Sequence, residues 1–463
     1  MIARLHIEER IREWGLSEEV IEKDYVLGWL LWAIGTDPEL SEQWAFKGGT
    51  CLKKCYLETY RFSEDLDFTV VPGGPVAPEE VEPILRRLLD RAGQESGIDF
   101  LSTPPRLKAG GGGNFTQGRI YYVGPRQTPT PARVKLDLSA SEVIARPTVL
   151  RPISHPYPDT LPGQGTVRCY AFEEVFAEKI RAMGERGRPR DLYDIINLFR
   201  REDLQGQRDT VVEVLHDKCR SKGVAVPTLR AIVAAETRVE LESEWFNMLG
   251  HQLPKIPPFE AFWDELAALF DWLEGTRSPV AQEPISVARA GLEDRSWTPP
   301  STVTTWRGSA PMESVRFAAA NRLCVELGYN GSRRLIEPYS LRRSQAGNIL
   351  LYGIRVDTRE PRAYRVDRIE SIAVTDRSFT PVYRVEIGAA GSLSAPSVAT
   401  STPHAGIRPS RSRNTGSVYI VECPACGKQF KRKTRDTSLR PHKTPDGYRC
   451  PGRGRGLLID TRY

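Results

Sequence analysis

The stretch Phe46–Phe68, which reads FKGGTCLKKCYLETYRFSEDLDF, constrains the fold and chemistry of this chain more than any other. It begins with two glycines and a threonine and ends with Asp65 and Asp67. Side chains alternate along a strand, so these two carboxylates are expected on one face of a sheet. Carboxylates together with substrate phosphates hold Mg²⁺ in proteins, and glycines let a backbone approach a phosphate closely. The stretch therefore predicts metal-dependent phosphoryl or nucleotidyl transfer.

The flanking sequence predicts the elements that would frame such a site. Apolar spacing of three and four residues predicts helices over 4–34 and 79–92, and a helix that follows Lys47. A strand over 132–138 places Lys135 and Asp137 on one face, so Asp137 is either a third metal-facing carboxylate or a salt-bridge partner. Four consecutive glycines at 110–113 are interpreted as a hairpin tip, with a phosphate cradle as the alternative.

Residues 171–200 predict two helices that carry charged side chains. Glycines at 184 and 187 and a proline at 189 are expected to end the first helix, which carries Lys179. The second is expected to begin near residue 190, with Asp191 and Asp194 three residues apart on one face. Basic side chains near a metal–phosphate site would clamp triphosphate oxygens, whereas the alternative is charge pairing at helix ends.

Composition bounds the class of protein. The 463 residues predict two to four domains, and 40% apolar with 27% charged residues is typical of an ordinary globular chain. No apolar run approaches the ~20 residues that span a bilayer, and the N-terminus lacks the apolar core of a signal peptide, so a cytoplasmic protein without a membrane partner is expected. Five cysteines are scattered, so no disulfide framework is predicted; they are Cys51, Cys55, Cys169, Cys219 and Cys324.

The C-terminal half changes character. Residues 205–275 predict helix throughout, 275–311 and 388–416 are expected to be linkers, and 312–387 combine a short helix with strands that predict a small β-barrel. Residues 401–463 contain 14 Lys and Arg against 4 Asp and Glu, so this tail carries +10 and the rest of the chain −4. A basic tail predicts an anionic partner, most plausibly nucleic acid.

The tail also contains four residues suited to zinc. Cys423 and Cys426 form a C-x₂-C turn, and His442 and Cys450 follow it. Four soft ligands of this kind suit one tetrahedral structural Zn²⁺. A redox C-x-x-C pair or free thiols are the alternatives.

With these residues in view, the first 270 residues resemble the AbiEii/AbiGii family of nucleotidyltransferase-like toxins. The motifs that carry this resemblance are Glu22–Tyr25 (EKDY), Phe46–Thr50 (FKGGT), Arg61–Asp67 (RFSEDLD), Val134–Asp137 (VKLD), Glu178–Ala182 (EKIRA), and Arg190-Asp191 with Asp194. The resemblance implies an α+β fold with a polymerase β-like nucleotidyltransferase core over about 20–200 and a helical part over about 201–274.

The resemblance also implies roles for individual residues. Nucleotide binding falls to the Gly-Gly-Thr segment, to the residues beside it and to a later lysine, namely Lys47, Gly48, Gly49, Thr50, Ser63 and Lys179. Asp65 and Asp67 would bind Mg²⁺ or Mn²⁺, and Asp137 would be the third sheet carboxylate. Asp194, with Asp191 as its rival, would activate the acceptor.

Residues 312–387 are similar to a WYL domain, an Sm/SH3-like barrel that senses nucleic-acid or nucleotide ligands. The matching pieces include Arg334–Pro338, Leu351–Gly353 and Tyr364–Ile369. The resemblance makes candidates of four ligand-binding residues, Tyr352, Arg362, Arg365 and Arg368, although a core tyrosine and surface arginines are the alternative. Residues 417–463 look like a small zinc-ribbon module.

Two functions are consistent with the whole sequence. The first is an NTP-dependent, Mg²⁺-dependent nucleotidyltransferase of a toxin-like phage-defence type. It would modify RNA such as tRNA, or protein, under control of the WYL-like domain and of a cognate antitoxin. The second is a catalytically silent regulator of defence genes that binds nucleic acid or a small ligand.

Overall fold

The protein is described from a computed structural model of the whole chain. It describes residues 1–57, 60–110, 112–201, 207–276, 282–287, 293–294, 297, 312–387, 418–423, 425–426, 428–432, 436–439, 441–442, 444, 450, 454–455 and 457–462. The chain divides into two compact units, Met1–Pro396 and Ser397–Tyr463. No helix in the described ranges is long and apolar enough to cross a membrane.

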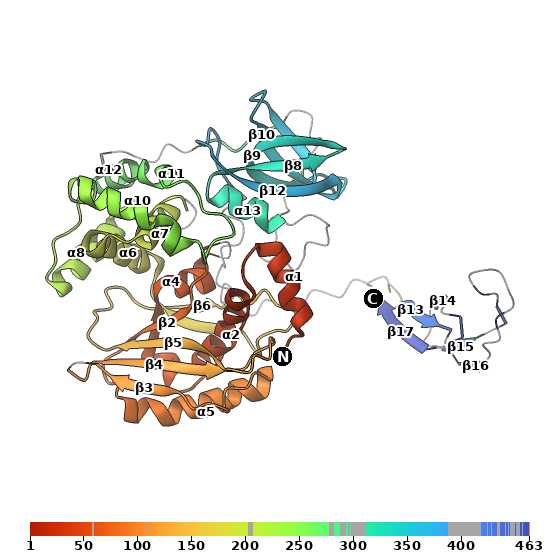
Figure 1. Cartoon of the computed structure of the whole chain (residues 1–463), viewed down its shortest axis with the longest axis horizontal. Helices are drawn as coiled ribbons and strands as arrows, with labels where there is room; N and C mark the ends of the chain where they lie inside the picture. The colour runs from red at the N-terminus through yellow and green to blue at the C-terminus, as the bar shows by residue number, and fades with distance from the viewer. Residues whose placement is uncertain are drawn as a thin grey trace, which may run out of the picture. The chain divides into compact units, whose positions relative to one another are not determined.

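A seven-stranded mixed sheet is the framework of the first unit (Figure 1). Its strand order is β3-β4-β5-β2-β1-β7-β6, and the pairs β2–β5 and β1–β7 are parallel. The strands are β1 (Trp44–Lys47), β2 (Asp65–Val70), β3 (Arg106–Ala109), β4 (Phe115–Tyr122), β5 (Ala132–Ser139), β6 (Val149–Pro152) and β7 (Thr166–Cys169). The predicted strand over 132–138 is confirmed as β5, and Asp65 and Asp67 lie on a strand as expected. Gly110, Gly112 and Gly113 lie between the antiparallel strands β3 and β4, where the favoured interpretation put a hairpin tip.

Helices before and after β2 carry the apolar residues that cover this sheet. They are α1 (Arg4–Trp14), α2 (Glu18–Gly35), α3 (Leu40–Gln43), α4 (Gly48–Cys51), the π-helix η1 (Leu52–Tyr56) and α5 (Pro78–Ser96). The predicted helix over 4–34 is interrupted at Gly15, whose left-handed φ of 66° ends α1. Helix α5 buries a stripe of Val81, Leu85 and Leu88 and lies along the β3 end of the sheet (Figure 1), as its helical spacing predicts.

The helical part follows the sheet. It comprises α6 (Phe172–Arg186), α7 (Pro189–Phe199), α8 (Arg208–Lys222), α9 (Leu229–Ile232), α10 (Ala235–Leu249), α11 (Glu260–Trp263) and α12 (Leu266–Glu274). Gly184 lies inside α6, so this helix runs further than predicted and ends at Gly187, whose φ is +52°. The expectation of helix throughout 205–275 is wrong in detail, because turns with Gly223 and with Pro254, Pro257 and Pro258 separate the helices.

Residues 312–378 form a helix and a five-stranded antiparallel sheet. The elements are α13 (Met312–Ala320), β8 (Leu323–Tyr329), β9 (Ser332–Arg343), β10 (Ile349–Arg355), β11 (Pro361–Arg365), the short η3 (Val366–Arg368) and β12 (Ile369–Ser378). Strands β11 and β12 are the ends of the order β11-β10-β9-β8-β12, so closure into a barrel remains a prediction. Part of the expected linker packs on this sheet: Ile285 is buried beside Tyr339 and Tyr352.

Helix α13 is buried between this sheet and helix α1. Phe317 and Glu313 of α13 line a cavity of about 30 Å³ together with Glu13 and Trp14 of α1 and Phe62. The region similar to a WYL domain therefore contacts the first helix and the segment that precedes β2.

The second unit has two small antiparallel sheets. One has the order β14-β13-β17, and the other pairs β15 with β16. The strands are β13 (Val418–Glu422), β14 (Gln429–Arg432), β15 (Ser438–Leu439), β16 (Gly454–Arg455) and β17 (Leu457–Arg462). The predicted linker over 388–416 lies outside the described residues.

Candidate active site and metal centres

Strand register gathers three aspartates on one face of the large sheet. Asp67 of β2 pairs with Asp137 of β5 on one side and with Lys47 of β1 on the other, while Asp65 pairs with Lys135. Residues paired across neighbouring strands point to the same face. The structure therefore brings the three predicted sheet carboxylates together, and we call Asp65, Asp67 and Asp137 the carboxylate triad.

The nearby lysines form ion pairs with carboxylates other than those of Asp65 and Asp67. Lys47 forms ion pairs with Glu142 and with Glu178, the latter at 3.8 Å. Lys135 Nζ lies 2.5 Å from Asp137 Oδ2, so the salt-bridge interpretation of Asp137 also holds. Within the described ranges, neither the Asp65 nor the Asp67 side chain has an ion-pair or hydrogen-bond partner.

The pKa values of the two unpaired aspartates reflect this environment. Burial raises the pKa of Asp67 to about 6; the nearby Lys47 lowers it, and the like charges of Asp65 and Asp137 raise it further. Burial also raises the pKa of Asp65, against the charge of Lys135. Two carboxylates that share one face of the sheet and have no ion-pair partner in the described ranges are suited to a divalent ion with oxygen ligands.

The two predicted glycines form a close turn against the triad. Gly48 has a φ of +80°, and a Cβ there would lie 2.5 Å from Oδ2 of Asp67. A Cβ on Gly49 would lie 2.7 Å from the Arg61 guanidinium and 3.0 Å from Ser63 Oγ. The positive φ and the close approach of Asp67 favour glycine at position 48, and the backbone at Gly49 lies close to Arg61 and Ser63. The predicted nucleotide-binding residues Gly48, Gly49 and Ser63 meet at the edge of the triad.

Thr50, the third residue of this turn, is engaged elsewhere. Its hydroxyl is buried and donates a hydrogen bond of 2.6 Å to the backbone carbonyl of Asp65. This bond ties α4 to the start of β2. In this structure Thr50 positions the turn relative to the aspartates.

Asp194 lies at the centre of a buried charge cluster. Arg61 donates two hydrogen bonds of 2.7 Å to its two carboxylate oxygens, Lys179 Nζ lies 2.7 Å from Oδ2, and Tyr60 donates to Oδ1. Burial alone would raise the pKa of Asp194, but Arg61 and Lys179 hold it well below its usual value. We call Asp194, Arg61, Lys179 and Tyr60 the Asp194 cluster. Asp191, the rival candidate, is bound instead by Arg186, which donates two hydrogen bonds of 2.8 and 2.9 Å to its carboxylate.

Two structural contributors to the site were missed from the sequence. Arg61 was quoted only as part of a motif, yet it holds Asp194 from 133 residues away. Lys54, within the stretch Phe46–Phe68, forms a buried ion pair of 2.7 Å with Asp24 of the Glu22–Tyr25 motif. The sequence offered one signal for this pair: an acid and a lysine each lie within an otherwise apolar segment. A buried charge needs a partner of opposite charge, so the two could have been predicted to meet.

Three of the cysteines expected to be scattered meet in the core. The sulfur atoms of Cys51, Cys55 and Cys169 lie within 4.8 Å of one another, and all three side chains are buried. They are free thiols. Their separation in the sequence suggested that these cysteines lie apart. The pairing of β7 with β1 instead brings Cys169 next to α4, which follows β1.

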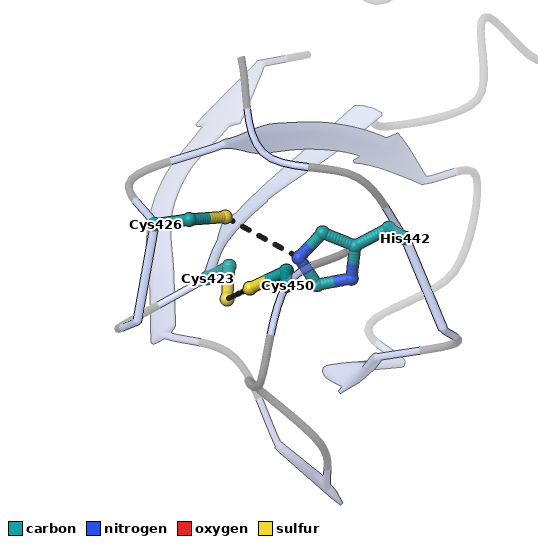
Figure 2. A group of neighbouring side chains, drawn as sticks. All are labelled: Cys423, Cys426, His442 and Cys450. Atoms are coloured by element: carbon teal, nitrogen blue, oxygen red, sulfur yellow. Dashed lines mark hydrogen bonds between the residues drawn. The ribbon is translucent and has the colours of Figure 1, made fainter. Parts of the chain in front are cut away.

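The four predicted zinc ligands of the second unit converge (Figure 2). The sulfurs of Cys423 and Cys450 are 3.8 Å apart, and Cys426 Sγ lies 3.4 Å from His442 Nε2. Zn–S bonds of ~2.3 Å at tetrahedral angles separate two sulfurs by about 3.8 Å. Burial would raise the pKa of the Cys423 thiol, but the backbone N–H groups of Ala425 and Cys426 lower it to about 7. The geometry thus fits a tetrahedral metal, and we call this group the Cys₃His cluster.

The four candidate ligand residues of the smaller sheet lie in different environments. Tyr352 is buried, and its hydroxyl donates a 2.8 Å hydrogen bond to Glu293. Arg362 pairs with Glu360, Arg365 pairs with Asp367 at 2.7 Å, and Arg368 is exposed in η3. The core interpretation of Tyr352 therefore describes its position best.

Comparisons with known proteins agree with this geometry. The model of the family described as "Nucleotidyl transferase AbiEii toxin, Type IV TA system" matches residues 29–268, and that of the WYL domain matches residues 312–374. No curated protein matches the chain.

Two solved structures show weaker similarity. MenT4, a nucleotidyltransferase toxin of Mycobacterium tuberculosis H37Rv, has 20% identity and a TM-score of 0.43, with 59% of this chain and 90% of that chain covered. The proteasome accessory factor B/C of Arthrobacter aurescens has 15% identity and a TM-score of 0.16, with 62% and 41% covered.

Proposed function

The chain belongs to the AbiEii family of nucleotidyltransferase toxins and carries a WYL domain, and we propose that it transfers a nucleotide from an NTP to RNA, such as tRNA, in a reaction that depends on Mg²⁺. A protein hydroxyl is the other acceptor that this chemistry allows. The observation that supports the proposal most strongly is the register that puts the carboxylate triad beside the Gly48–Gly49 turn.

Asp65 and Asp67 are the residues that would hold Mg²⁺, because both carboxylates are unpaired in the described ranges and lie on the same face of the sheet. The metal would neutralise charge on the phosphates when it is bound. The backbone of Gly48 and Gly49 and the Ser63 hydroxyl would bind phosphate oxygens at close range. Lys179 would act as a fixed positive charge, since Asp194 holds its ammonium group at the inner end of the site.

The acceptor must lose a proton as its oxygen attacks the α-phosphorus and pyrophosphate leaves. Asp194 is poorly suited to accept that proton, because it is fully buried and bonded to two cations and one hydroxyl. Asp137 is half-buried on the open face and is a better-placed candidate. We therefore assign Asp194 to positioning Lys179 and Arg61.

The remaining modules are proposed to serve this enzyme. The WYL domain would bind a nucleotide or nucleic-acid ligand and change the transfer rate through α13, which packs against Phe62 and α1. The Cys₃His cluster would hold a structural Zn²⁺. A cognate antitoxin would restrain the activity, as expected of a toxin–antitoxin system.

Incubation of the full-length protein with each labelled NTP, Mg²⁺ and total RNA tests the proposal. We expect label on RNA that is lost on chelation of the divalent metal. Asp67→Asn should reduce transfer by at least 10²-fold without changing the unfolding temperature much, since the Asp67 side chain has no ion-pair or hydrogen-bond partner among the described residues. Transfer by this variant at the wild-type rate, or no label on RNA or protein with the wild type, would contradict the proposal. The second result would favour a silent binding protein.

A further inference from the structure

Basic side chains extend from the carboxylate triad across the open face of the sheet. In β4–β5 register, Arg119 pairs with Lys135 and Tyr121 pairs with Arg133; in β3–β4 register, Arg106 pairs with Arg119 and Lys108 pairs with Gln117. Paired residues share a face, so this is the face that carries Asp65 beside Lys135. We call this surface the basic platform; its residues are Arg106, Lys108, Arg119, Tyr121, Arg133 and Lys135.

The outer cations of the platform have no acidic partners. Arg106, Lys108, Arg119 and Arg133 are exposed, and none of them forms an ion pair with another described residue. Single exposed arginines without an ion pair among the described residues, such as Arg12 and Arg230, occur elsewhere on the first unit, whereas Arg86 and Arg238 are paired with glutamates. Four uncompensated cations side by side repel one another, so the surface is suited to a polyanion.

The platform opens directly into the site. A cavity of about 310 Å³ is lined by Asp65, Glu64 and Lys23 on one side and by Arg119, Arg133, Lys135 and Gln117 on the other. Lys23 is paired with Glu64, so the unpaired positive charge in this cavity belongs to the two arginines. Two arginines of the platform and Asp65 of the triad therefore line one and the same cavity.

We propose that the basic platform binds the sugar–phosphate backbone of an RNA acceptor and leads its reactive end to the carboxylate triad. The inference rests on the proposed function and selects RNA over a protein acceptor. Three strand spacings, about 14 Å, separate Arg106 from Asp65. This is too far for the triphosphate at the Gly48–Gly49 turn to engage the outer cations.

Charge and aromatic content both favour a nucleic acid. Arginine binds phosphate oxygens in a bidentate manner, and Tyr121, partly buried with the Arg106 guanidinium 5.8 Å from its ring centre, offers a flat surface on which a base stacks. A protein acceptor would need a strongly acidic segment next to its hydroxyl to use this surface.

The test uses full-length protein with Arg119→Glu and Arg133→Glu combined, and neither residue belongs to the triad or the Gly48–Gly49 turn. The KM for RNA should rise at least tenfold, while the KM for NTP and the unfolding temperature stay close to wild type. Arg12→Glu combined with Arg86→Glu, on α1 and α5, makes the same change in net charge and should leave both KM values unchanged.

A binding measurement without NTP separates this inference from the proposed function. Filter binding of labelled RNA at increasing salt concentrations gives the slope of log K against log salt. This slope should be less steep by about 1.4 in the double variant Arg119→Gln with Arg133→Gln than in wild type, since each of two phosphate contacts on a single strand contributes about 0.7. This loss would support the platform even if the wild type transferred no label. The inference would be overturned if these variants bound RNA with wild-type affinity and salt slope. It would also be overturned if label appeared on protein alone and the variants transferred it at the wild-type rate.

Discussion

Replacing Asp194 by asparagine tests whether the Asp194 cluster holds the site together or takes part in the chemistry. The substitution keeps the shape of the side chain and removes its charge. Arg61 and Lys179, whose side chains are only 4% and 11% exposed, would then be two buried cations without a counter-charge. Removing one partner of a buried ion pair costs about 3–5 kcal/mol, because the other charge stays desolvated. One carboxylate here serves two cations, so we expect the upper part of this range.

The assay is thermal and urea unfolding of the full-length protein beside nucleotidyl transfer measured well below the unfolding temperature. A loss of about 4 kcal/mol corresponds to a decrease on the order of 10 °C for a domain of this size. The pKa of Asp194 is lower in the folded than in the unfolded protein, so its stabilising effect is present above the ordinary aspartate pKa and is lost as pH falls below it. The difference between wild type and variant should therefore narrow below about pH 4.

Asp191→Asn is the matched control, since Asp191 is equally buried on the same helix. Its partner Arg186 has a side chain that is 48% exposed and can turn to water, so about 1–2 kcal/mol is expected. Equal destabilisation by the two substitutions would refute the reasoning. So would an Asp194→Asn protein with wild-type stability and no transfer, because that pattern belongs to a residue that activates the acceptor.

Two further predictions concern the other parts of the chain. Burial raises the pKa of Glu13 to about 7, with Arg10 opposing and Glu313 of α13 and Glu9 adding to the effect. The folded protein thus keeps a proton on Glu13 that the unfolded chain releases above about pH 4.5, so the free energy of unfolding should fall between pH 5 and 7 by on the order of 2 kcal/mol. Urea unfolding of Glu13→Gln should no longer show this decrease. A Glu13→Gln protein with the wild-type pH dependence would contradict this prediction. Metal analysis should find one zinc per chain, bound at the Cys₃His cluster. Cys426→Ser should lose this zinc, while the unfolding of the first unit stays unchanged. An unchanged zinc content in Cys426→Ser would contradict the assignment.

The parts of the site that the sequence predicted well depend on local geometry. Alternation along a strand places Asp65 with Asp67, and Lys135 with Asp137, on common faces wherever those strands lie. Helix periodicity and the breakers after Met183 likewise predicted α6 and α7. These features need only the backbone repeat, so they can be read from a few neighbouring residues.

The parts that were missed depend on pairing between distant segments. The parallel pair β2–β5 joins residues 70 positions apart, and β1–β7 brings Cys169 to Cys51 and Cys55. Nothing in a local pattern says which strands pair, so the thiols were judged scattered. The choice between a core and a ligand-binding role for Tyr352 stayed open in the sequence for a related reason: its burial depends on Glu293 and other residues of a segment expected to be a linker.

The distribution of charge links these observations to the chemistry. Lys47, Lys135 and Lys179 all lie near the triad, yet each is paired with a different carboxylate, which leaves Asp65 and Asp67 without a counter-ion in the described ranges. If those lysines neutralised the two aspartates, a divalent cation would gain little by binding there. Because they do not, a bound divalent cation is our proposed source of the missing positive charge, and the unpaired cations of the basic platform begin on β5, the strand next to β2. The triad has unpaired negative charge, which a metal ion would balance. The platform has unpaired positive charge, which a polyanion would balance, and both lie on the same face of the sheet.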